Sequence, residues 1–429
     1  MASMSGSSTP ASTASRRGLL SLWMARDVYA LGNWVVLVAL LTWTYRTRES
    51  AAVVSMLMLG QLLPPFLLGP VAGYWVNVRN ARAVGIGAQV LRAAALVPLL
   101  RVADNNDLKL VLVVFALASV PSAFVRASHL VLLRGAIDSS NTAFLKRDLF
   151  ATGILTMVLG PYAGTIVFSI DGLHGCTVIV LIATLLSALL LALSHSSSVA
   201  VPPALPRRSL ARTLADLSTG LAIALQRPSA RPVVIIRLVV ALVAGGLVVA
   251  EVAFMVWGLF TGVENVGIVL ASEGMGMGVG AIIYIFVRRR FPASILIATA
   301  LVIVAFGEFG FAISAALKAA ACLGGVVGLG KGMLSLSLVP FVADLSADDS
   351  SAPSTSDGLD FAAEAAALVS IVAIGPLTDS ITPRFTIVLA SIVTMVLALY
   401  AFGSVPDREA PAEVARTAGN EIFSSLPTA

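Results

Sequence analysis

Long apolar stretches, each close to the ~20 residues that cross the hydrocarbon core of a bilayer, follow one another along the whole chain. The stretches are continuously apolar, which argues against the alternating pattern of a membrane β-barrel. Short polar turns separate them. The pattern predicts twelve membrane-spanning helices, at residues 25–45, 52–76, 83–102, 108–131, 149–170, 174–193, 232–259, 264–287, 292–315, 319–343, 359–379 and 383–403.

The longest interruption of this pattern divides the predicted helices into six and six. The predicted organisation is an N-terminal tail (1–22), a first bundle (23–193), a linker (194–231), a second bundle (232–403) and a C-terminal tail (404–429). Within the linker, leucines recur every three or four residues from Leu210 to Leu225 beside several arginines. This spacing predicts an amphipathic helix on the membrane surface, with a binding site for a soluble partner as the alternative.

Composition and charge agree with this architecture and orient it. The chain is 58% hydrophobic and 12% charged, whereas soluble domains carry about 25% charged residues. Seventeen of the 28 basic residues fall on the side of the N-terminus and six on the other, so the positive-inside rule places both termini in the cytoplasm. We therefore attribute the net charge of +5 to membrane topology and not to nucleic-acid binding, and expect a plasma-membrane location.

The first residues allow more than one interpretation. They are rich in serine and threonine and contain Arg16 and Arg17, which is compatible with a transit peptide or a twin-arginine signal. We interpret them as a cytoplasmic tail, because the later spans already account for membrane insertion.

Three Gly-Pro sequences occur at related positions. They are "LGPVAG", "LGPYAG" and "IGPLTD", in predicted helices two, five and eleven, which are separated by three and by six helices. Repeats of this kind are typical of secondary transporters, which alternate access to a site near the middle of the membrane.

The turn after predicted helix two reads "GPVAGYWVNVRNARA" and contains Gly73, Asn77, Arg79 and Arg82. With six plus six helices, it resembles the signature of the major facilitator superfamily, in which this turn acts as a cytoplasmic gate. Asn77 stands where the family has an aspartate, so the resemblance implies a weaker gate. A purely topological role of the two arginines is the alternative.

A second motif is similar to the exporters and antiporters of this superfamily. "GILTMVLGPYAG" supplies Gly153, Gly160, Pro161 and Gly164, as in the helix-five motif of that group. The stretches "ARDVYALGNW" and "AQVLRAAAL" resemble the branch with macrolide-efflux and siderophore-export proteins, with Asn33 in place of an acid and Arg92 matching an arginine. The resemblance implies an all-α fold of two six-helix bundles, active as a monomer.

Charged residues inside the predicted spans are the candidate functional residues, because a charge at mid-bilayer costs at least ~2.5–3.5 kcal/mol. In the family, helices one, four, seven and ten line the central cavity. On that resemblance we expect Glu251 to couple protons, Lys331 to be its electrostatic partner and Glu273 to be the reserve acid. Structural ion pairs between helices are the alternative.

The remaining intramembrane charges lie elsewhere along the spans. Arg92 is near the middle of helix three, and it and Glu308 are expected to have structural roles. Asp27 and Arg126 lie near cytoplasmic ends, where long side chains reach the interface. An interfacial anchor is the expected role of Asp27 beside Arg26, with a proton relay as the alternative. Arg92, Arg126 and Asp27 are kept as further candidates for proton coupling or for lining the cavity.

Motifs of hydrolases, zinc enzymes and ATPases were not found in the sequence, and we expect no enzymatic activity, cofactor or metal. The glycine-rich "GMGMGVG" of Gly274–Gly280 is interpreted as a close helix contact. The leading hypothesis is a transporter that exports a hydrophobic or amphiphilic small molecule against protons, with lipid as its surroundings. The alternatives are a lipid or nutrient transporter without proton antiport, and a membrane receptor that does not transport.

Overall fold

The computed structural model describes residues 16–101, 107–136, 142–194, 219, 221–228, 230–257, 259, 265–347 and 355–406, and all regular structure among them is helical. The elements are α1 (Arg16–Arg48), α2 (Ala51–Val78), α3 (Ala81–Leu96), the 3₁₀ helix η1 (Val97–Arg101), α5 (Leu108–Ala136), α6 (Thr142–Leu193), α8 (Arg231–Trp257), α9 (Val266–Val287), α10 (Ala293–Ile313), α11 (Leu317–Ala347), α12 (Thr355–Ser380) and α13 (Pro383–Ser404).

Within the described residues, eleven helices are long and apolar enough to cross a membrane. One of them, α6, contains two spans, because its backbone leaves the helical conformation at Asp171 and Gly172. Gly172 has φ of 56°, a left-handed conformation that glycine adopts without steric cost. The described chain therefore forms twelve spans, and the predicted all-α polytopic fold is confirmed.

Two helices begin before their predicted boundaries. α1 already begins at Arg16, inside the predicted tail. α12 begins at Thr355, before the predicted start at residue 359. The predicted amphipathic linker helix lies outside the described residues except for a helical stretch at 221–226, and so do the C-terminal tail from residue 407 and most of the N-terminal tail.

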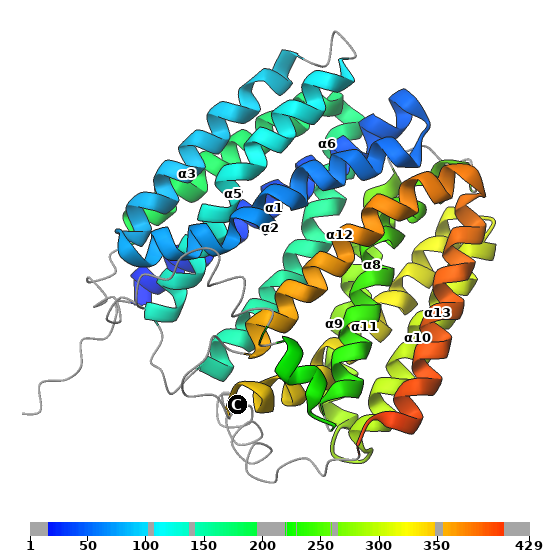
Figure 1. Cartoon of the computed structure of the whole chain (residues 1–429). Coiled ribbons are helices and arrows are strands. Elements are labelled where there is room, and N and C mark those ends of the chain that lie inside the picture. The colour runs from blue at the N-terminus through cyan, green and yellow to red at the C-terminus, as the bar shows by residue number, and fades with distance from the viewer. Residues whose placement is uncertain are drawn as a thin grey trace, which may run out of the picture.

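The helices form two groups, α1–α6 and α8–α13, coloured blue to teal and green to red in Figure 1. The two halves meet chiefly where α2 packs on α12 and where α6 packs on α9. Of these four helices, α2, α6 and α12 contain the Gly-Pro prolines Pro70, Pro161 and Pro376. The recurring sequence motif thus marks the helices along which the halves touch.

A polar contact joins the halves at the end of the bundle that is predicted to face outward. Asp379 of α12 accepts hydrogen bonds from the Ser50 hydroxyl at 2.7 Å and from the amides of Ala51 and Ala52 at 2.7 and 3.0 Å. These amides are at the start of α2, where backbone N–H groups have no acceptor within the helix. An acid of one half therefore caps a helix of the other half.

Candidate functional site

Four ionisable side chains gather inside the second half, and we call them the acid–lysine cluster. Each comes from a different helix: Glu251 from α8, Glu273 from α9, Glu308 from α10 and Lys331 from α11. The three glutamates are 6%, 5% and 2% exposed. Four helices that are apolar along most of their length thus bring their few charges together, away from lipid.

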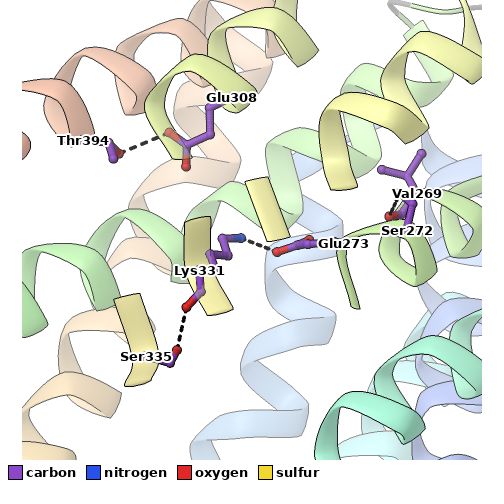
Figure 2. Close-up of polar contacts among 7 residues, drawn as sticks. All are labelled: Val269, Ser272, Glu273, Glu308, Lys331, Ser335 and Thr394. Carbon is purple, nitrogen blue, oxygen red and sulfur yellow. Dashed lines mark hydrogen bonds and ion pairs between the residues drawn. The ribbon is translucent and has the colours of Figure 1, made fainter. Parts of the chain in front are cut away.

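The closest contact in the cluster is the ion pair between Lys331 and Glu273, whose Nζ and Oε1 atoms are 2.5 Å apart (Figure 2). The Ser335 hydroxyl donates to the backbone carbonyl of Lys331 at 2.8 Å. Glu308 lies apart from this pair and accepts a hydrogen bond from the Thr394 hydroxyl of α13 at 3.2 Å (Figure 2). The direct partner of Lys331 is therefore Glu273, the expected reserve acid, and not Glu251.

Glu251 belongs to the cluster through electrostatic interactions. Its carboxyl group interacts electrostatically with Glu273, Lys331 and Glu308. Three carboxyl groups thus share one ammonium group. If all three were ionised, two negative charges would remain uncompensated in a medium of low dielectric constant, which is strongly unfavourable.

A small cavity adjoins this cluster. It is lined by Glu308, Lys331 and Thr394 together with apolar side chains of α8, α10, α11 and α13. In this conformation it has room for only about one or two water molecules. A drug-sized molecule could enter it only after the surrounding helices move apart.

A second polar pocket, which we call the Arg92 pocket, lies in the first half. Its lining is shared by α1, α2, α3 and α5 and consists of Asn33, Gln61, Arg92, Phe115, Ala118, Ser119, Ser122 and Arg126. Arg92 donates a hydrogen bond from Nη2 to Oδ1 of Asn33. Its guanidinium carbon lies 4.6 Å from the centre of the Tyr29 ring, a cation–π contact.

Of the other two candidate residues, Asp27 lines neither pocket, whereas Arg126 lines the Arg92 pocket. Asp27 pairs with Arg26 at 3.4 Å, and Arg26 also donates to the Thr152 hydroxyl of α6 at 2.7 Å. Arg126 lines the Arg92 pocket and interacts electrostatically with Glu364 of α12, across the two halves.

The residues of the predicted gate lie at the end of α2 and the start of α3. The Arg79 guanidinium stacks on the Trp75 ring at 4.7 Å, within its own helix end. Oδ1 of Asn80 accepts from the amides of Arg82 and Ala83 and so caps α3. A Cβ atom at Gly73 would meet nothing within 4 Å, and Asn77 is half-buried.

The glycines of the helix-five motif differ among themselves. A Cβ atom at Gly160 would overlap Trp34 of α1, and one at Gly164 would press on the backbone of Val35 at 3.1 Å. Gly153 has open space around it. Two of the three glycines thus permit close contact between α1 and α6.

Sequence reasoning did not bring Thr394 or Gln61 into the site, and it assigned Glu308 to structure alone. Thr394 and Gln61 are uncharged, and polar residues of these types are common in membrane helices, so only their positions in the fold single them out. Glu308 could have been identified as a functional candidate from the sequence, since it is an acid inside an apolar span.

Comparison with known proteins establishes the fold. No protein-family model matches the chain, and no curated protein matches it. Among solved structures, a POT family transporter in complex with 5-aminolevulinic acid has a TM-score of 0.69 at 11% identity, over 89% of this chain and 95% of that one. A POT family transporter in complex with a thioalcohol-conjugated peptide has a TM-score of 0.67 at 12% identity, over 89% and 95%.

A third structure, an auto-inhibited POT family peptide transporter, has a TM-score of 0.63 at 13% identity and covers 93% of this chain and 99% of that one. At these identities the likeness is one of fold. The chain is an integral membrane protein with the major facilitator fold, matched over nearly its full length.

Proposed function

We propose that this protein is a secondary active transporter that works by alternating access and exports an amphiphilic small molecule in exchange for protons. The fold supports transport, because its structural neighbours are described as transporters. The helix-five motif, with Gly160, Pro161 and Gly164, supports export by its resemblance to exporters and antiporters.

The acid–lysine cluster carries the proposal of proton coupling. Because Lys331 is paired with Glu273, its charge is already compensated. Glu251 is buried beside this pair, where an ionised carboxyl group would be costly, and we assign to it the proton that is carried while the site is closed to water. Opening the site to either side would hydrate Glu251 and allow its proton to leave or return.

Movement between the two states would use the contacts between the halves. The Gly-Pro sequences loosen the backbone of α2, α6 and α12 where the packing must change, since proline removes one helical hydrogen bond. We propose that Asn77, Arg79 and Arg82 form the cytoplasmic gate, in a weak version without the usual acid. The proposed location is the plasma membrane, with both termini in the cytoplasm.

The test uses the purified protein in liposomes with an imposed pH gradient, and follows lipophilic dyes and macrolides together with internal pH. Parent protein should move a substrate and protons together. Glu251→Gln should abolish accumulation driven by the gradient but keep exchange of substrate down its own gradient, because only the titratable proton is lost. The control is Asp360→Asn, an exposed acid whose partner Arg237 lies in the same half.

Each other result changes the proposal in a defined way. Proton-coupled transport that survives in Glu251→Gln would remove this residue from the mechanism. Substrate movement without proton flux would favour the lipid or nutrient transporter, and specific binding without any counterflow would favour a receptor.

A further inference from the structure

We infer that the Arg92 pocket binds the anionic group, a carboxylate or a phosphate, of the transported molecule, which makes the substrate of the proposed transporter an amphiphilic acid. This inference rests on the proposed function for its biological meaning. The binding itself rests on the pocket alone.

The first observation is the state of the Arg92 guanidinium group. Arg92 is 2% exposed, and its Nε and Nη1 atoms have no hydrogen-bond acceptor among the described residues. Within that part of the chain no carboxylate lies within ion-pair distance of it. Its hydrogen-bond partner among the described residues is Asn33, whose amide oxygen accepts one hydrogen bond but brings no negative charge.

Such an arrangement is unfavourable unless something else enters the pocket. A buried cation without a counter-charge is strongly unfavourable, and the contact with the Tyr29 ring face offsets only part of that penalty. An anion would remove the penalty and would accept a hydrogen bond from Nε or Nη1. Carboxylates and phosphates are the acceptors that guanidinium groups bind most strongly, because the hydrogen bond is then assisted by both charges.

The second observation is that the rest of the lining fits the same ligand. Arg126 adds a second guanidinium group to the pocket. Glu364 of α12 compensates part of the charge of Arg126, but no described acid lines the pocket itself. Oε1 of Gln61 is buried without a partner, and its amide can rotate to present either its oxygen or its nitrogen to a ligand.

The size of the pocket limits what it holds. In this conformation the pocket is narrow, with room for about one water molecule. Entry of a carboxylate or phosphate group therefore requires the lining side chains to move apart, and the apolar remainder of an amphiphile must lie outside the pocket. The second half offers the opposite charge, since its cluster has three acids for one lysine. The anionic end of a substrate is therefore directed to the first half.

The experiment measures ligand-induced shifts of the melting temperature of the purified full-length protein, at constant ionic strength. The probes are 4-phenylbutyrate, its uncharged amide and inorganic phosphate. Parent protein should be stabilised by 4-phenylbutyrate and not by the amide. Stabilisation by phosphate to the same extent would identify a free anion as the occupant, and its absence would identify the headgroup of an amphiphile.

Three variants separate binding from structure. Arg92→Gln should weaken the apparent affinity for the acid at least tenfold, while the protein without ligand melts at the same or a higher temperature, because an uncompensated charge has been removed. Arg92→Lys should restore part of the affinity. Arg289→Gln, an exposed arginine in the turn after α9, is the matched control and should behave as the parent.

The inference is overturned if no anion stabilises the parent, or if Arg92→Gln responds to 4-phenylbutyrate as the parent does. A large drop in the melting temperature of ligand-free Arg92→Gln, with unchanged affinity, would assign Arg92 to structure. Because binding is measured at equilibrium without a gradient, these outcomes do not depend on whether the protein transports.

Discussion

At the scale of single residues, the buried charges of this protein differ in whether an opposite charge lies beside them. The Lys331–Glu273 pair joins α11 to α9 through one contact of 2.5 Å. Among the described residues, Arg92 has an amide as its hydrogen-bond partner and an aromatic ring beside it, but no carboxylate within ion-pair distance. The first arrangement is a satisfied pair and the second an unsatisfied cation, so the two charges are expected to respond differently to substitution.

Lys331→Met should reduce the free energy of unfolding by about 3 kcal/mol, because Glu273 is left buried without its counter-charge. The double variant Lys331→Met with Glu273→Met should recover most of the loss, since a pair of apolar side chains replaces a pair of charges. Equilibrium unfolding in mixed micelles measures both. Equal losses in the single and double variants would show that the contact itself, and not the orphaned charge, is what matters.

At the scale of elements, glycines determine how closely α9 and α11 approach. A Cβ atom at Gly276 would overlap the carbonyl oxygen of Gly325, and one at Gly280 would overlap that of Leu329. From the other side, a Cβ atom at Gly328 would overlap the carbonyl oxygen of Glu273. The glycine-rich segment of α9 is therefore a close helix contact, as its sequence indicated, and this contact sets the distance between Glu273 and Lys331.

Gly276→Ala should destabilise the protein by about 1–3 kcal/mol, the usual cost of overpacking, because the backbones of α9 and α11 must move apart. Gly278→Ala is the control on the same helix. There a Cβ atom would meet only the Ile154 side chain at 3.4 Å, which is ordinary contact. Thermal unfolding in detergent compares the two, and equal melting temperatures would refute the role of the close contact.

At the scale of the whole molecule, the two halves are joined at one end by Asp379. Its carboxylate caps the start of α2, so that an ion–dipole interaction adds to three hydrogen bonds. Any state open at this end must break these contacts. They favour the conformation seen here, in which the two halves are in contact at this end.

Asp379→Ala should shift the population toward the state open at that end by about fivefold, corresponding to roughly 1 kcal/mol for an exposed cap. Spin labels at Arg101 and Lys318, both exposed and in different halves, would report the distance after removal of Cys176 and Cys322. Asp360→Ala is the control, because this acid of the same helix pairs with Arg237 within its own half. Identical distance distributions in Asp379→Ala and the parent would contradict this role.

Much of the fold followed from the sequence for a plain physical reason. In lipid, backbone groups must find their partners inside the segment, so an apolar stretch of sufficient length is a helix. The same reasoning found the boundary within α6, where Gly172 interrupts the helix. It also found Glu251, Glu273 and Lys331, because charges in such stretches are rare.

The partners of these residues could not be predicted in the same way. A helix that is apolar on all sides has no periodicity that fixes its rotation, so the sequence does not say which face meets which neighbour. Glu273 and Lys331 are 58 residues apart and Arg92 and Asn33 are 59 apart. Contacts of about 3 Å between such residues depend on helix rotation and depth, which packing sets.

By itself, then, the sequence determined that the chain crosses the membrane as two groups of six helices, and which helices carry charges and helix-weakening Gly-Pro sequences. Hydrophobic length and backbone hydrogen bonding act locally, and a sequence contains that information. Only the tertiary structure decided that Lys331 pairs with Glu273, that no described carboxylate pairs with Arg92, and that Asp379 joins the two halves at one end. Those outcomes depend on the relative positions of helices far apart in the chain, which are set by close packing across the whole molecule.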